Sequence, residues 1–333
     1  MTDRDVVVPG GMDSLTDIVT LATTAETLGY DRISLPEVTG RDGVTVLATL
    51  AARTERIGLS NDVFSPYARS PAMLGQTGVA LQEASGGRYR MGLGTSSPDL
   101  TEKWHLAEFD RPLRYLRETI DIVRQVTNGE RVDYDGEFFQ GGGLRLRGVD
   151  PTTVPIDVAA LGPKAVELAG RFADGWVPQL FTVGALCDRL DDFRRGVELA
   201  DDDVESRRVA VTVRSCALDD RSRAREIARQ QLGFMIGAYG PYYRQSIAEQ
   251  GFDTETDAIR SAWTDGDQDG AIEAVTDEMV DELVAAGTPD EVRERVERYA
   301  AIDGVSAVRI GFFGGQTADE RERTLEVLTP GDD

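Results

Sequence analysis

The chain has 333 residues, enough for two ordinary domains or for one large α/β barrel. Its formal net charge is −23, from 59 acidic against 36 basic residues, and its only lysines are Lys103 and Lys164. This balance argues against nucleic acid or an anionic membrane as a partner. The acidic, lysine-poor composition also suggests an origin in high salt. The sequence has no apolar run of membrane-spanning length and no signal-peptide core, so we expect a cytoplasmic protein.

Strand-like and helix-like segments alternate from the start of the chain. Strands are predicted at 4–10, 31–37, 56–64 and 88–94, and helices at 14–30, 43–55 and 70–87. Residues 95–110 are predicted to form an irregular insertion. A helix at 111–129 and a hairpin around Asp135-Gly136 are expected to follow.

The regular alternation then resumes. Strands are predicted at 155–161, 175–179, 208–218 and 305–313, and helices at 163–173, 183–200, 221–235, 288–304 and 318–328. A capping box from Thr288 to Glu291, with Pro289 at the first helical position, marks one helix start. The pattern predicts an α/β fold, a (β/α)8 TIM barrel forming one domain over 1–333. Insertions are expected after strand four (about 95–110) and strand seven (about 236–270). The alternative is a doubly wound sheet with a helical domain.

The stretch MGLGTSSPD at 91–99 is the first candidate for ligand binding. In such barrels, sites gather at the C-terminal ends of the strands. Close-approach glycines followed by the hydroxyls of Thr95, Ser96 and Ser97 could present N–H groups to a phosphate. The stretch does not complete the dinucleotide fingerprint, and it follows the fourth strand and not the first. The alternative is an ordinary loop.

A second candidate for anion binding is the stretch Leu161, Gly162, Pro163 and Lys164. Gly162 lets the backbone turn, Pro163 stands at a helix start, and Lys164 lies in the first helical turn. The helix N-terminus carries partial positive charge, which favours an anion. The alternative is a plain connection between a strand and a helix.

Two residues are candidates for proton transfer. Glu37 ends the second strand between proline and valine, where it could donate or accept a proton or position a ring nitrogen. A salt bridge to an arginine is the alternative. His105, the only histidine, could lie with Trp104 over a pocket, or could be a surface or packing residue. Tyr239 belongs to an aromatic group in the second insertion. One histidine and no cysteine cluster give no reason to expect a metal site.

The ordered stretches LPEVTGRDG, ERIGLSNDVFSPYARSPA, GGRYRMGLGTSSP and PIDVAALGPKAVELAGRFADGWVP resemble the luciferase-like monooxygenase superfamily. The closer likeness is to its branch that uses the deazaflavin coenzyme F420, including methylenetetrahydromethanopterin reductase. The resemblance covers nearly the whole chain. It implies a barrel that holds a flavin or deazaflavin at its mouth, with a non-prolyl cis peptide at Asp62-Val63 behind the ring. It places the cofactor phosphate at Thr95, Ser96 and Ser97 and at Leu161, Gly162 and Pro163, and it places Glu37 beside the ring.

Two positions depart from patterns within this branch. Val38 stands where several dehydrogenases carry a histidine, and apolar residues surround Val6 where the pterin reductases carry a glutamate.

The resulting hypothesis is an F420-dependent oxidoreductase that transfers a hydride between the deazaflavin and a small organic substrate. Glu37 and His105 are its candidate catalytic residues, and Trp104 and Tyr239 would border the substrate. The predicted cofactor contacts are Asp62, Val63, Thr95, Ser96, Ser97, Leu161, Gly162, Pro163 and Lys164. The alternatives are an FMN-dependent monooxygenase and a non-catalytic flavin-binding barrel. Since family members are often dimers, a homodimer is expected.

Overall fold

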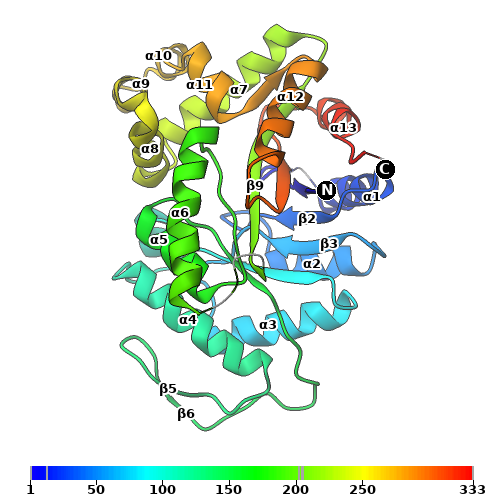
Figure 1. Cartoon of the computed structure of the whole chain (residues 1–333), viewed down its shortest axis with the longest axis vertical. Helices are drawn as coiled ribbons and strands as arrows, with labels where there is room; N and C mark the ends of the chain where they lie inside the picture. Colours follow the sequence, from blue (N-terminus) through cyan, green and yellow to red (C-terminus); the bar gives the residue numbers. More distant parts are fainter. Residues whose placement is uncertain (1, 13, 202, 204–205, 332–333) are drawn as a thin grey trace.

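A closed barrel of eight parallel strands forms the centre of the molecule (Figure 1). The computed structural model describes residues 2–12, 14–201, 203 and 206–331. The strand order is β1-β2-β3-β4-β7-β8-β9-β11, and β11 pairs back onto β1. The predicted (β/α)8 barrel is therefore confirmed. Its strands are β1 (Asp3–Val7), β2 (Arg32–Leu35), β3 (Gly58–Asn61), β4 (Tyr89–Leu93), β7 (Ile156–Val158), β8 (Gly175–Trp176), β9 (Arg208–Ala217) and β11 (Ala307–Gly311).

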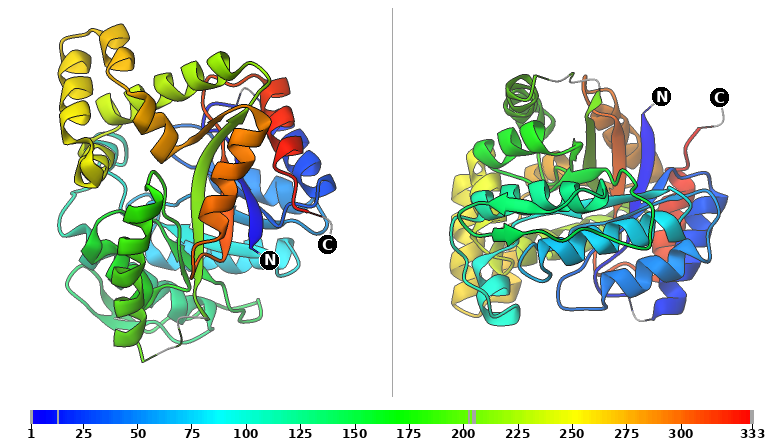
Figure 2. Two further views of the ribbon diagram at one scale, coloured as in Figure 1. Left: turned by 45° about the horizontal axis from the view of Figure 1, so that its top comes forward. Right: turned by 90° about the horizontal axis from the view of Figure 1, so that it is seen from below.

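Helices surround these strands, as Figure 2 shows. Ser14, Thr288 and Thr317 each begin a helix with a capping box, so the box predicted at Thr288 is confirmed. The helices that flank the barrel are α1 (Leu15–Thr27), α2 (Gly43–Ala51), α3 (Pro71–Ala84), α4 (Pro112–Thr127), α5 (Pro163–Phe172), α6 (Val183–Leu199), α7 (Arg221–Gly237), α12 (Pro289–Ala300) and α13 (Ala318–Val327).

The segment between β4 and β7 is more ordered than its sequence suggests. Residues 95–110, expected to be irregular, contain a short π-helix, η1 (Leu100–Trp104). The predicted hairpin forms from β5 (Asp133–Asp135) and β6 (Gln140–Gly142). The carboxylate of Glu118, fully buried in α4, accepts hydrogen bonds from the backbone N–H groups of Glu137, Phe138 and Phe139. Glu118 thereby fixes the hairpin turn to the barrel.

The segment after β9 forms a helical layer beside the barrel mouth (Figure 1). A separate apolar cluster, which includes Leu232, Phe252, Ile259 and Met279, holds this layer together. Residues 236–270 are thus mostly helical. The elements of the layer are α8 (Pro241–Ile247), η3 (Ala248–Phe252), α9 (Asp253–Thr264), α10 (Gln268–Glu273), α11 (Asp277–Leu283) and β10 (Ala285–Gly287), which pairs with the end of β9.

A layer of charged side chains fills the barrel interior near the start of its strands. Asp157 binds Arg90 (Oδ2 to Nε, 2.9 Å), and the fully buried Asp5 binds Arg208 (Oδ2 to Nη2, 2.6 Å). Arg32 lies among these four groups and donates to backbone carbonyls. Each carboxylate is paired with an arginine, and Arg32 is held by carbonyl acceptors, which together make it possible to bury these charges in the low-dielectric interior. The opposite end of the barrel is left for ligand binding.

Candidate active site

A cavity of about 1190 Å³ opens at the mouth of the barrel. We call it the mouth cavity. It brings together residues from strand ends, from the loop after β4 and from the helical layer after β9. The site residues predicted from the sequence that line it are Glu37, Asp62, Val63, Thr95, Ser96, Ser97, Trp104, Leu161, Gly162, Pro163, Lys164 and Tyr239. Only His105 of that set lies outside the lining.

One wall of the cavity is the segment after β3. The Asp62-Val63 peptide bond is cis, as the family resemblance implies. Asp62 forms an ion pair with the buried Arg309 (Oδ2 to Nη2, 2.9 Å). The glycines of the 91–99 stretch pack against this segment, since a Cβ on Gly92 would lie 2.2 Å from the carbonyl oxygen of Asn61. Gly92 therefore makes room for the neighbouring strand, whereas Gly94 lines the cavity beside Val63.

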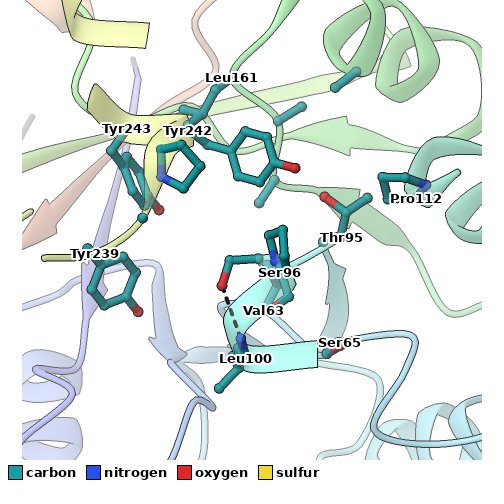
Figure 3. A pocket seen from close by; sticks show the side chains of 18 of the residues that line it. Val63, Ser65, Thr95, Ser96, Leu100, Pro112, Leu161, Tyr239, Tyr242 and Tyr243 are labelled. Carbon is teal, nitrogen blue, oxygen red and sulfur yellow. Dashed lines mark hydrogen bonds between the residues drawn. The ribbon is translucent and has the colours of Figure 1, made fainter. Parts of the chain in front are cut away.

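The loop from Thr95 to Ser97 borders the cavity beside this wall (Figure 3). Ser96 has a left-handed backbone with φ of 65°, which is uncommon outside glycine and turns the chain sharply. The hydroxyl oxygen of Ser97 accepts a hydrogen bond from the Leu100 N–H at 3.3 Å, drawn as a dashed line in Figure 3. Its hydrogen remains available to a ligand, because a hydroxyl can donate and accept at once.

The second predicted anion site is the start of α5. Gly162 is the N-cap, and no side chain caps the N–H groups of the first turn. Such N–H groups and the helix dipole together attract an anion. Lys164 stands in the same turn, and Lys103 on η1 lines the same cavity. Both lysines of this acidic chain therefore lie at one cavity.

Glu37 lies in the cavity wall but is already bound by protein groups. Arg69 holds both carboxylate oxygens, with Nη2 2.8 Å from Oε2, and the Gly43 N–H donates to Oε2 at 2.6 Å. Arg69 also binds Asp42 at 2.8 Å and stacks over the ring of Phe64. The salt bridge considered as the alternative for Glu37 is therefore present. Sequence reasoning missed Arg69 because it lies 32 positions from Glu37.

His105 is half-buried immediately after η1, close enough to Glu37 and Arg69 for both charges to act on it. Its pKa is lowered from 6.5, first because burial disfavours the imidazolium, with Glu37 raising it and Arg69 lowering it. At neutral pH the imidazole is therefore neutral. Trp104, its neighbour, lines the cavity and is 57% exposed.

Three tyrosines project over the cavity from the segment around the start of α8 (Figure 3). They are Tyr239, Tyr242 and Tyr243. Behind them, Gln179, three residues after β8, contacts Tyr243 and Arg214. Sequence reasoning noted the aromatic group that contains Tyr239. It missed Arg214, whose only signal is a charge inside a strand that is otherwise largely apolar.

Among the residues that the structure describes, no group of three or more His, Cys, Asp or Glu side chains is placed to hold a metal ion. Across the same residues, no helix combines the length and apolar character needed to cross a membrane.

A (β/α)8 barrel with its ligand cavity at the C-terminal mouth defines a large class of enzymes and binding proteins. Within that class, the family model described as luciferase-like monooxygenase matches residues 2–307. The chain belongs to this family, and the resemblance inferred from its sequence is confirmed.

Two curated relatives and one solved structure show which kinds of family member the chain is similar to. The chain is 32% identical over 313 residues to a 5,10-methylenetetrahydromethanopterin reductase of Archaeoglobus fulgidus, covering 91% of each chain. It is 31% identical to a putative coenzyme F420-dependent oxidoreductase of Mycobacterium tuberculosis, covering 84% of this chain and 86% of the relative. The solved structure of the F420-dependent tetrahydromethanopterin reductase of Methanopyrus kandleri shares the fold. Its TM-score is 0.86 at 21% identity, covering 98% of this chain and 97% of that one.

Proposed function

We propose that the protein is an F420-dependent oxidoreductase that moves a hydride between the deazaflavin and a small organic substrate. One observation carries the proposal: a single cavity joins the Val63 wall, the 95–97 loop and the uncapped start of α5 to the Glu37–Arg69 pair. The relatives at 31–32% identity, which are named for F420 or for a pterin reductase, support the same cofactor.

The residues present fit a flavin-like cofactor with a phosphate. Gly162 has open space where a side chain would be, with no atom within 4 Å of a Cβ placed on it, so the start of α5 is accessible to an anion. The N–H groups of this turn, Lys164 and the hydroxyls of Thr95 and Ser97 would hold the phosphate. Asp62 and Val63 would support the ring. When bound, the deazaflavin supplies a two-electron hydride carrier.

Glu37 and His105, the two candidates for proton transfer, have different roles. Glu37 has both oxygens occupied by Arg69 and Gly43, so it serves to organise the site. His105 lies next to Trp104 but outside the cavity lining, so its imidazole would exchange a proton with a bound ligand through an intervening water. Trp104 and Tyr239, both exposed in the cavity lining, would border the substrate and exclude water from it.

A binding titration tests this assignment directly. Oxidised F420 and FMN are titrated separately into the purified protein in high salt, with cofactor fluorescence as the signal. We expect F420 to bind more tightly, and we expect Thr95→Trp or Ser96→Trp to abolish binding while circular dichroism stays unchanged. Preferential FMN binding with oxygen-dependent turnover would instead support the monooxygenase alternative. Unchanged F420 binding by both variants would contradict the placement of the cofactor against the 95–97 loop.

A further inference from the structure

A hydrogen-bond chain runs from Arg214 in β9 to the mouth cavity, and the guanidinium of Arg214 fixes its direction. The guanidinium of Arg214 donates from Nη1 to the carbonyl oxygen of Phe312 at 2.9 Å and from Nη2 to Oε1 of Gln179 at 3.4 Å. A guanidinium has only donors. The side of the Gln179 amide that faces Arg214 must therefore be its oxygen.

The orientation of Gln179 determines what Tyr243 can do. With its oxygen turned to Arg214, Gln179 presents its NH2 group to the Tyr243 hydroxyl, at 2.5 Å from Nε2. The tyrosine oxygen is thus the acceptor in this contact, and its single hydrogen is left over. No acceptor for that hydrogen is found among the residues that the structure describes.

We propose that Tyr243 is a dedicated hydrogen-bond donor to an electron-rich oxygen of the bound ligand, oriented by the Arg214–Gln179 pair. This inference rests on the proposed function, because it adds a recognition element to the same cavity. The chemical class that it selects is a carbonyl, carboxylate or phenolate oxygen. An ammonium group, which can only donate, would leave the tyrosine hydrogen unpaired at a cost.

The surroundings of Tyr243 support a donor role. Burial raises the pKa of Tyr243 above its ordinary value, so the hydroxyl keeps its hydrogen at neutral pH. The ring of Tyr239 lies 5.7 Å away and covers one side. A donor held in a partly desolvated wall and aligned in advance binds its acceptor more strongly than the same group in water.

Three variants separate this role from simple packing. Tyr243→Phe removes the donor. Gln179→Glu keeps the size of the side chain and strengthens the contact with Arg214, but its carboxylate captures the tyrosine hydrogen. Tyr242→Phe is the matched control, because Tyr242 lines the same cavity from the same helix and makes no hydrogen bond among the described residues.

Two probes identify which ligand carries the oxygen. The first is oxidised F420, titrated by its fluorescence. The second is carbonyl-labelled acetophenone, whose C=O stretch is recorded by infrared spectroscopy in the F420-loaded protein. A hydrogen bond to the carbonyl lowers the frequency of this stretch. If the acceptor is on the cofactor, Tyr243→Phe and Gln179→Glu weaken F420 binding about tenfold and Tyr242→Phe does not. If it is on the substrate, F420 affinity is unchanged and the two variants abolish the lowering of the carbonyl frequency.

Either pattern supports the donor role. The proposal is overturned if neither probe separates Tyr243→Phe and Gln179→Glu from Tyr242→Phe, with circular dichroism and Tm confirming that all three are folded. Failure of the wild-type protein to bind F420 is a different result, because it contradicts the proposed function. In that case the titration is repeated with FMN, and the same comparison of variants decides the role of Tyr243.

Discussion

A Cβ on Gly94 would lie 2.6 Å from Cγ2 of Val63, closer than two carbon atoms can approach without displacement. Gly94→Ala should therefore push the Val63 side chain toward the cavity. We expect F420 binding to weaken about tenfold while the fold is retained, measured by fluorescence titration and thermal melting. Gly184→Ala is the control, because nothing lies within 4 Å of that position. Unchanged binding by Gly94→Ala would show that Val63 is not a wall of the cofactor site.

The pKa of His105 can be measured by NMR without resonance assignment, because the protein has one histidine. A proton NMR titration should give a midpoint below 6.5. Burial is the first cause, so the midpoint should stay low in variants of the charged pair. Glu37→Gln removes the charge that raises the pKa and should lower the midpoint further, whereas Arg69→Gln should raise it. An unchanged midpoint in both variants would place His105 away from this pair.

The ion pairs inside the barrel, near the start of its strands, should contribute strongly to the free energy of unfolding. Asp157→Asn leaves Arg90 buried without its anionic partner and should cost about 3–5 kcal/mol of unfolding free energy. Asp303→Asn, at a fully exposed carboxylate paired with Arg194, should change stability little. Thermal melts of both variants in the same buffer measure the difference. Equal melting temperatures would mean that the layer contributes no net stability.

The pH dependence of this effect has a definite sign. Burial is the largest single influence and opposes ionisation of Asp157, but Arg90, Arg208 and Arg32 together outweigh it and lower the pKa below 3.8. The contribution is therefore fully present above about pH 4, which is the unfolded pKa, and is lost as pH falls through the lower folded pKa. The stability difference between wild type and Asp157→Asn should shrink in acid. A difference that grew in acid would contradict the assigned pairing.

Glu118 should control the order of the hairpin turn. Glu118→Gln replaces the carboxylate that accepts these backbone N–H groups with an amide, whose NH2 group cannot accept them. The substitution should lower the free energy of unfolding by about 2 kcal/mol. Hydrogen exchange at Glu137, Phe138 and Phe139 should accelerate, because their N–H groups lose this acceptor. Glu108→Gln is the control, because Glu108 is exposed in the preceding loop. Unchanged exchange in Glu118→Gln would show that Glu118 does not hold the turn in place.

The net charge of −23 predicts a salt requirement. Like charges repel one another across the folded surface, and salt screens this repulsion within about 10 Å at 0.1 M ionic strength and more closely above it. The melting temperature should rise from dilute buffer to molar KCl. A maximum of stability in dilute buffer would contradict the inferred high-salt origin.

Local signals explain why most of the fold could be predicted. Capping at Thr288, the glycine turn near Gly162 and apolar periodicity are all encoded within a few residues, so element order and the barrel follow from them. The same holds for the 95–97 and 161–164 loops, which the barrel rule places at the mouth. The π-helix at Leu100–Trp104 was not predicted, because its i to i+5 hydrogen bonds have no simple sequence pattern.

Long-range pairs explain what could not be predicted. Arg69 reaches Glu37 across 32 positions, and Gln179 meets Tyr243 across 64. The side chains of Arg69 and Gln179 could each hydrogen-bond to many different residues. Their actual partners are determined by the closed barrel, which brings distant parts of the chain together. The same closure brings Asp5 to Arg208 across 203 positions.

The location of the two lysines has a chemical consequence. Lys103 and Lys164 are the only side-chain amines in the protein, and both line the mouth cavity. An amine-reactive fluorophore or crosslinker would therefore modify side chains at this one place, without any engineered attachment point. The remaining basic side chains are arginines and one histidine, so amine-directed labelling of side chains is confined to the mouth cavity.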